Sequence, residues 1–194
     1  MECEHCCYAC TTHGQDMSLK TFRKALKYDE IVSIGGGEPT IHPKFWEILG
    51  LAIGNSEYVW LATNGKKTDI AIALAKLAQK GVIGCDLSQD SYHEPIDEEV
   101  VQAFTKNKKA GIGGYYSTDN NDARSIRNVT GKEIISGRCD FGDNKGCVCP
   151  ELFCAPDGTI KGCGCIDAPV FGNINAEVNI PDEWQHGECY KDQQ

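Results

Sequence analysis

Two kinds of hydrophobic pattern take turns along the first 117 residues. Short apolar runs typical of buried strands are followed by longer stretches with apolar residues three or four positions apart, which is typical of helices. The predicted strands cover residues 31–34, 58–62, 82–87 and 111–117, and the predicted helices cover residues 18–28, 45–53, 69–80 and 97–108. Strands that alternate with helices predict an α/β fold with a parallel sheet and right-handed crossovers.

Polar residues gather where the predicted strands end. These segments are Gly35 to Thr40, Thr63 to Gly65 and Ser88 to Glu94. In parallel α/β barrels the carboxyl ends of the strands form the face where binding sites are built. Glycine lets the backbone approach a ligand closely, and a buried carboxylate at Glu38 would need a cationic partner. The sequence therefore predicts a ligand-binding edge.

The pattern changes after residue 118. Residues 119–128 are polar and predict a loop, and the remainder is rich in cysteine and glycine. Asp157-Gly158 lies between two short β-prone segments, residues 151–154 and 159–161, and predicts a hairpin turn. We therefore expect two domains, covering residues 1–118 and 119–194.

Four of the 12 cysteines lie within the first ten residues: Cys3, Cys6, Cys7 and Cys10. Neighbours this close rarely satisfy disulfide geometry with one another, whereas thiolates at these spacings suit an iron–sulfur cluster. Cys3, Cys7 and Cys10 have the spacing with which three thiolates hold a four-iron cluster and leave one iron open. Zinc and ordinary thiols are the alternatives.

Seven further cysteines lie in the second predicted domain: Cys139, Cys147, Cys149, Cys154, Cys163, Cys165 and Cys189. The predicted hairpin would bring Cys154 toward Cys163 and Cys165, as small metal-binding modules do. We expect an iron–sulfur cluster there, with zinc as the alternative, and our preferred ligands are Cys147, Cys163, Cys165 and Cys189. Cys85 lies within a predicted strand and is expected to be a buried apolar thiol.

Charge and hydropathy narrow the functional classes. The net charge of −9 disfavours a nucleic-acid groove, which needs clustered Lys and Arg. The chain has no apolar run near the ~20 residues that cross a bilayer, so no membrane partner is expected. Without a recognisable signal peptide before Cys3, we expect a cytoplasmic protein.

The cysteine loop and the strand-end segments together resemble the radical S-adenosylmethionine (SAM) superfamily. The resemblance covers residues 3–117 and implies a partial (β/α) barrel with a 4Fe-4S cluster that chelates SAM. Reductive cleavage of SAM would then give a 5′-deoxyadenosyl radical that abstracts hydrogen from the substrate. By resemblance, Glu38 with the backbone of Gly36 and Gly37 would hold the methionyl amino group. Asn64, Ser88 and Asp90 would contact its carboxylate or the ribose.

The N-terminus departs from the family pattern in two ways. The family places a strand before the cysteine loop, where this chain has only Met1 and Glu2, so the first strand is expected to be lacking. The family also favours an aromatic residue or His before the last ligand; Ala9 precedes Cys10, but His5 precedes Cys6. We favour the register of Cys3, Cys7 and Cys10. The alternative is a truncated chain that retains two ligands, Cys3 and Cys6.

The C-terminal region resembles the SPASM and twitch extensions of the same superfamily. Gly158 followed by Cys163, with Cys147 before them, and residues 171–174 (Phe-Gly-Asn-Ile) match the opening of that pattern. Later cysteine steps are missing, which favours a twitch-like module with one auxiliary cluster. The resemblance implies an enzyme with a peptide or protein substrate and a donor such as flavodoxin or ferredoxin. A non-catalytic iron–sulfur or zinc protein is the alternative.

Overall fold

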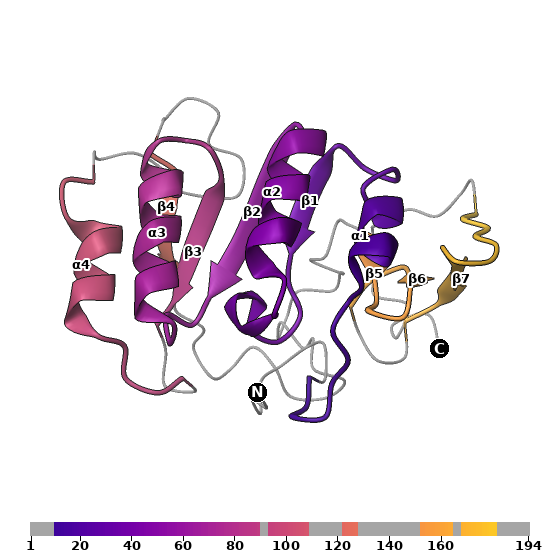
Figure 1. Ribbon diagram of the computed structural model, residues 1–194, viewed down its shortest axis with the longest axis horizontal. Coiled ribbons are helices and arrows are strands. Elements are labelled where there is room, and N and C mark those ends of the chain that lie inside the picture. The colour runs from indigo at the N-terminus through magenta and orange to yellow at the C-terminus, as the bar shows by residue number, and fades with distance from the viewer. Residues whose placement is uncertain (1–9, 90–92, 109–121, 128–151, 165–167, 182–194) are drawn as a thin grey trace, which may run out of the picture. The chain divides into compact units, whose positions relative to one another are not determined.

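The computed structural model describes residues 10–89, 93–108, 122–127, 152–164 and 168–181 (Figure 1). The chain packs as two units, the first made of Met1–Ala25 with Gly131–Gln194 and the second of Leu26–Thr130. Each unit has its own sheet. The predicted division of the chain at residues 118 and 119 falls outside the described ranges and stays a prediction.

The second unit contains a parallel sheet of four strands in the order β1-β2-β3-β4 (Figure 1). Its elements are β1 (Ile31–Ile34), η1 (Pro39–Ile41), α2 (Phe45–Asn55), β2 (Tyr58–Thr63), α3 (Thr68–Gln79), β3 (Gly84–Ser88), α4 (Glu98–Thr105) and β4 (Arg124–Arg127). The α/β class, the parallel pairing, the first three predicted strands and the last three predicted helices are confirmed. The described strands form a parallel sheet, and its closure into a barrel stays a proposal.

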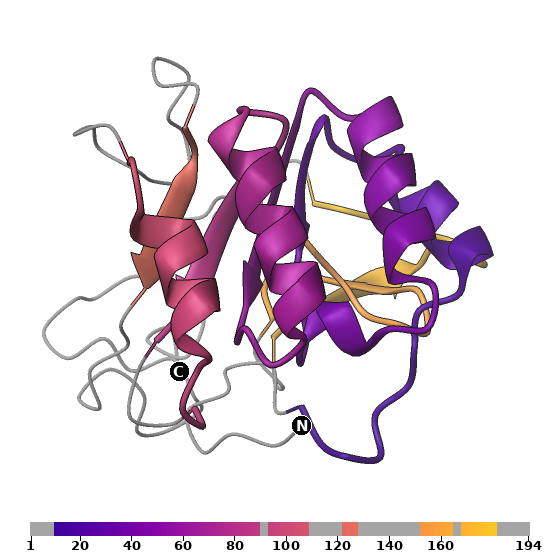
Figure 2. The same cartoon turned by 60° about the vertical axis from the view of Figure 1, so that its left-hand side comes forward.

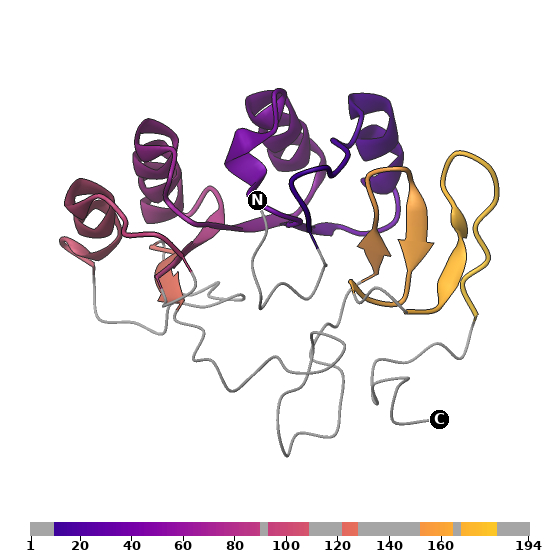
Figure 3. The same ribbon diagram turned by 90° about the horizontal axis from the view of Figure 1, so that it is seen from below.

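Helices α2, α3 and α4 cover one face of this sheet, as Figure 3 shows. Because successive side chains of a strand point to opposite faces, Val59, Leu61 and Thr63 of β2 are buried together. Helix α3 contributes a buried row of small and branched residues, Ala71, Leu74, Ala75 and Ala78. Figure 2 shows α3 beside α4, with which it packs. The side chains of opposite parity, among them Tyr58, Trp60 and Asp86, point to the other face of the sheet.

The expectation of a loop at residues 119–128 is wrong at Arg124–Arg127, which form β4 and pair in parallel with β3. Arg124 is only 2% exposed. A polar segment was expected to be a loop, but the charge of this arginine is paired with Asp122 and can therefore be buried. Its Nε donates to Asp122 Oδ1 at 2.8 Å and its Nη2 to Asp122 Oδ2 at 2.6 Å. Its Nη1 donates to the carbonyl oxygens of Ala103 and Lys106 at the end of α4. The predicted strand at residues 111–117 lies outside the described residues.

The first unit contains α1 (Leu19–Ala25) and an antiparallel sheet of β5 (Phe153–Cys154), β6 (Thr159–Lys161) and β7 (Val170–Asn173). The predicted hairpin is confirmed: Gly158 has φ 90°, and the Thr159 nitrogen donates to Asp157 Oδ1 at 2.8 Å. Ser18 caps α1, because its Oγ accepts from the Thr21 nitrogen at 3.0 Å.

Helix α1 packs within the first unit against the small sheet. Ala25 contacts the apolar cluster of Ile160, Phe171 and Ile174. The Nζ of Lys24 donates to the Ile174 carbonyl oxygen at 3.2 Å and to Asn175 Oδ1 at 3.0 Å. Residues from the two ends of the chain therefore share one core. Among the described residues, no helix is long and apolar enough to cross a membrane.

Candidate ligand-binding edge of the parallel sheet

Glu38 links the ends of β1 and β2. Its carboxylate is buried, and its Oε1 accepts from the Thr40 nitrogen at 3.1 Å, from Thr40 Oγ1 at 2.7 Å and from Thr63 Oγ1 at 2.9 Å. Its Oε2 accepts from the Asn64 nitrogen at 2.7 Å. Two of the predicted segments, Gly35 to Thr40 and Thr63 to Gly65, therefore meet at one edge. Within the described part of the chain Oε2 accepts one hydrogen bond, and a carboxylate oxygen can accept a second one.

Two glycines shape this edge, and both have a left-handed backbone. Gly36 has φ 115°, and a Cβ added there would meet no atom within 4 Å. Its surroundings are open, as close approach of a ligand to the backbone requires. Gly65 has φ 75°, and its added Cβ would lie 2.9 Å from Ile96 Cγ2 and 3.0 Å from Leu87 Cδ1. The turn after Thr63 thus needs glycine for conformation and for space.

Ser88, at the end of β3, is 3% exposed, and its Oγ accepts from Arg127 Nη2 at 3.0 Å. The guanidinium of Arg127 therefore donates to a buried hydroxyl. Sequence reasoning missed Arg127 because it assigned residues 119–128 to a loop. The feature that reveals Arg127 is the pairing of β3 with β4, which places it opposite Ser88. Asp90 lies outside the described residues.

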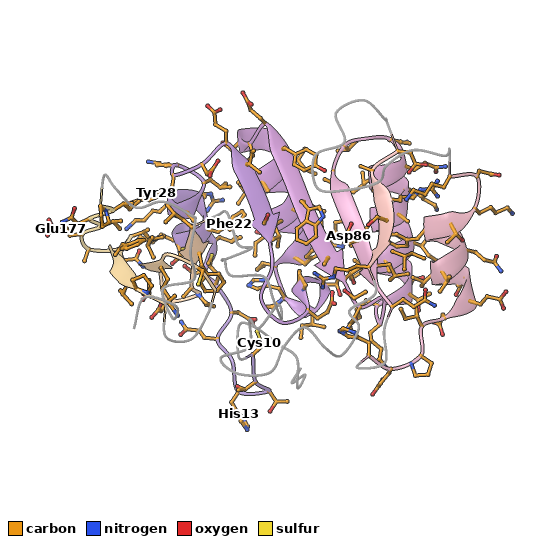
Figure 4. All side chains as sticks on the ribbon, turned by 180° about the vertical axis from the view of Figure 1, so that it is seen from behind. Cys10, His13, Phe22, Tyr28, Asp86 and Glu177 are labelled. Atoms are coloured by element: carbon orange, nitrogen blue, oxygen red, sulfur yellow. The ribbon has the colours of Figure 1, made fainter. Side chains whose placement is uncertain are left out.

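The face of the sheet opposite the helices carries a second polar pair. Asp86 Oδ1 accepts from Ser125 Oγ at 2.5 Å. On each strand this pair lies two residues before the pair of Ser88 and Arg127. Figure 4, seen from behind the helices, labels Asp86 on β3. On the same face of β2, Tyr58 and Trp60 close over Gly84, where an added Cβ would lie 2.2 Å from Tyr58 Oη. This face of the sheet is thus aromatic near the start of the strands and charged near their ends.

The described cysteines are Cys10, Cys85, Cys154 and Cys163. Cys85 is fully buried as predicted, and this burial, with smaller effects from the charges of Asp86 and Glu38, raises the pKa of its thiol well above the usual range. Burial also raises the pKa of Cys154 to about 11. The other candidate ligands, Cys3, Cys6, Cys7, Cys147, Cys165 and Cys189, lie outside the described residues. The described ranges contain no group of three His, Cys, Asp or Glu side chains placed to hold a metal.

The residues of this edge fit the head group of an amino acid. The open backbone at Gly36 and the remaining acceptor capacity of Glu38 suit an ammonium group, and Asn64 lies beside Glu38. Near the start of the sequence, Cys3, Cys7 and Cys10 have the softness and spacing for an iron–sulfur cluster.

Comparison with known proteins gives a local match. A segment of 69 residues, 36% of this chain, is 35% identical to mycofactocin maturase MftC of Mycobacterium ulcerans (strain Agy99). The matches to the proteins of the same name from Mycolicibacterium smegmatis and Mycobacterium tuberculosis (strain H37Rv) are 35% and 32% identical. The matched segment covers 17–18% of these relatives. No family profile and no solved structure match the chain. The likeness is local, and the resemblance of the C-terminal region to SPASM or twitch extensions stays a prediction.

Proposed function

We propose that this chain is a radical SAM enzyme that reductively cleaves SAM and starts hydrogen abstraction from a substrate. The observation that carries the proposal is the junction of Glu38 with Thr63 and Asn64. It brings together two segments, widely separated in sequence, that both resemble SAM-contacting segments of the superfamily. The partial similarity to a maturase supports the same class and favours a peptide or protein as the substrate.

In this proposal Cys3, Cys7 and Cys10 hold the 4Fe-4S cluster, and the cluster supplies the electron that cleaves SAM. Glu38 and the backbone of Gly36 and Gly37 bind the methionyl ammonium. Asn64, Ser88 and Asp90 remain proposed contacts to the carboxylate or ribose. The cysteines of the C-terminal region bind an auxiliary cluster, and a flavodoxin or ferredoxin donates the electrons.

The hydrogen bonds around Glu38 would hold its carboxylate in place before SAM binds. Four donors fix its carboxylate, so little rotational freedom is left to lose when an ammonium approaches Oε2. The buried position also strengthens an ion pair, since the effective dielectric is lower than in water. These residues bind and position, while the redox chemistry belongs to the bound groups.

The test is the formation of 5′-deoxyadenosine by protein reconstituted with iron and sulfide without oxygen, then reduced with dithionite and given SAM. We expect product from the wild-type chain and none from Cys10→Ala. The matched control is Cys85→Ala, which removes a buried thiol from β3 and should retain product. Stoichiometric zinc, together with no product from any variant, would instead favour the non-catalytic metal protein.

A further inference from the structure

Helix α1 carries three cations on the side that faces away from its packing partners. Lys20, Arg23 and Lys24 follow the spacing i, i+3 and i+4, so their side chains lie on one side of the helix. The other side holds Phe22, which is buried, and Ala25, which contacts the apolar cluster of the small sheet. We call the three cations the basic stripe of α1.

No carboxylate neutralises the basic stripe within the described part of the chain. Lys20 and Arg23 are exposed, and neither forms an ion pair there. Lys24 Nζ donates to two neutral oxygens, the Ile174 carbonyl and Asn175 Oδ1, and therefore keeps its full charge. In a chain of net charge −9, three such cations on one helix form a local positive field that attracts an acidic partner.

The stability of the helix does not account for the whole basic stripe. Cations are favourable at the C-terminal end of a helix dipole, and Arg23 and Lys24 lie in the last turn of α1. Lys20 lies in the first turn, where a positive charge is unfavourable and where no acidic residue accompanies it. The helix therefore gives no reason for Lys20, whereas attraction of an acidic partner does.

The place of α1 in the chain indicates the kind of partner. Cys10, a proposed cluster ligand, precedes Leu19 at the start of α1 by nine positions, and both belong to the first unit. Nine residues span roughly 30 Å at most, which limits the distance between α1 and Cys10. Figure 4 labels Cys10 and, on α1, Phe22. A protein that must approach the proposed cluster is its electron donor.

We propose that the basic stripe of α1 is the docking surface for an acidic electron-donor protein. Complementary charge would steer the donor to this helix and orient it there. The bound donor would lose the one electron that the proposed 4Fe-4S cluster accepts. The partner is thereby assigned to carriers whose docking face has clustered Asp and Glu. The inference rests on the proposed function, which requires such a donor.

The first test is binding, and its probe is an acidic 2Fe-2S ferredoxin titrated into the whole chain at low salt and followed by calorimetry. We expect Lys20→Gln combined with Arg23→Gln to weaken binding about tenfold, as loss of two rim charges implies. The difference should vanish at 1 M salt, where the Debye length is about 3 Å. Lys20→Arg combined with Arg23→Lys keeps both charges and should bind like the wild-type chain.

The matched control is Lys76→Gln combined with Lys80→Gln, which removes two exposed cations at the C-terminal end of α3 and changes the net charge equally. This variant should bind the ferredoxin like the wild-type chain. An equal loss of affinity in both double variants would overturn the proposal, because only net charge would then matter. No binding by the wild-type chain would also overturn it, as would tighter binding of duplex DNA or of phosphatidylserine vesicles than of the ferredoxin.

A second readout separates this inference from the proposed function. Reconstituted protein is given SAM and either prereduced ferredoxin or dithionite, and 5′-deoxyadenosine is measured. The Lys20→Gln and Arg23→Gln double variant should form product more slowly with ferredoxin and at the wild-type rate with dithionite, a small reductant that needs no docking surface. Equal rates of the two proteins with ferredoxin would contradict the docking surface alone. No product with dithionite would contradict the proposed function, and the binding titrations would still test the basic stripe.

Discussion

The carboxylate of Glu38 receives the backbone nitrogen of Asn64 at 2.7 Å, across 26 residues of sequence. This bond and the one from Thr63 Oγ1 connect the loop after β1, which contains Gly36 and Glu38, to the end of β2. Glu38 therefore has a structural role in the folded chain, the connection of two strand ends, that is independent of any ligand. Its proposed binding of an ammonium group is a second role, and experiments can separate the structural role from the binding role.

Glu38→Gln should lower both stability and SAM affinity. The amide NH2 group would face an N–H or O–H donor, so we expect a loss of roughly 1.5–3 kcal/mol in the free energy of unfolding. Loss of a desolvated charge partner should weaken SAM binding by about 30-fold or more. Denaturant unfolding and equilibrium SAM binding measure the two effects. Thr63→Val, which removes one donor to Glu38 and no charge, should lower stability but keep most of the SAM affinity.

Gly65→Ala should destabilise the second unit by about 1–3 kcal/mol, because the new Cβ meets Ile96 and Leu87 and the backbone has φ 75°. Gly50→Ala is the matched control, since Gly50 is exposed within α2 and its added Cβ has open space. That substitution should stabilise the chain by about 0.5–1 kcal/mol through helix propensity. Equal effects of the two alanines on thermal unfolding would contradict the described turn.

The ion pair of Asp122 and Arg124 should make stability depend on acid. Hydrogen bonds from Arg124 hold the pKa of Asp122 below its ordinary value of 3.8. Its ionised form therefore contributes stability that is fully present above pH 3.8 and is lost as the pH falls through the lower folded value. Asp122→Asn should be less stable than wild type at pH 7, with a difference that shrinks below pH 3.8. A constant difference measured from pH 7 to pH 2.5 would show that the charge of Asp122 contributes nothing.

Much of this arrangement could be predicted from local pattern. The apolar runs at residues 31–34 and 58–62 and the helical period of residues 69–80 predicted the parallel α/β sheet, and Asp157-Gly158 predicted the hairpin. Strand β4 could not be predicted in this way, because Arg124 is buried through partners at Asp122, Ala103 and Lys106 that only tertiary packing supplies. The same miss hid Arg127. Burial of Glu38 was expected with a cationic partner, and the described structure instead satisfies it with neutral donors.

The two cysteine registers make opposite predictions for Cys6 and Cys10. In the favoured register Cys6→Ala keeps the cluster and Cys10→Ala loses it, because Cys10 is the third ligand. Iron and sulfide content, together with the charge-transfer absorption of anaerobic protein, would measure this. A cluster that survives Cys10→Ala and disappears in Cys6→Ala would establish the alternative register.

Buried thiols should be distinguishable from ligands by their reactivity. Burial raises the pKa of Cys85, so its thiolate is scarce at pH 8 and iodoacetamide should label it only after unfolding. Mass spectrometry of native and urea-treated protein measures the protection. Labelling of Cys85 in the native chain at the rate seen in urea would contradict its place in the core of the second unit.

The contact between α1 and the small sheet also governs how the chain can be made. Lys24 and Ile174 are 150 positions apart, so a ribosome releases the helix long before its packing partners exist. Helix α1 is therefore without its packing partners while the whole parallel sheet is synthesised. Fragments that end after β4 would keep the helix and leave Ala25 without the core of Ile160, Phe171 and Ile174. Expression of such fragments should favour aggregation, whereas supplying residues 131–194 as a second polypeptide would give the helix the partner it lacks.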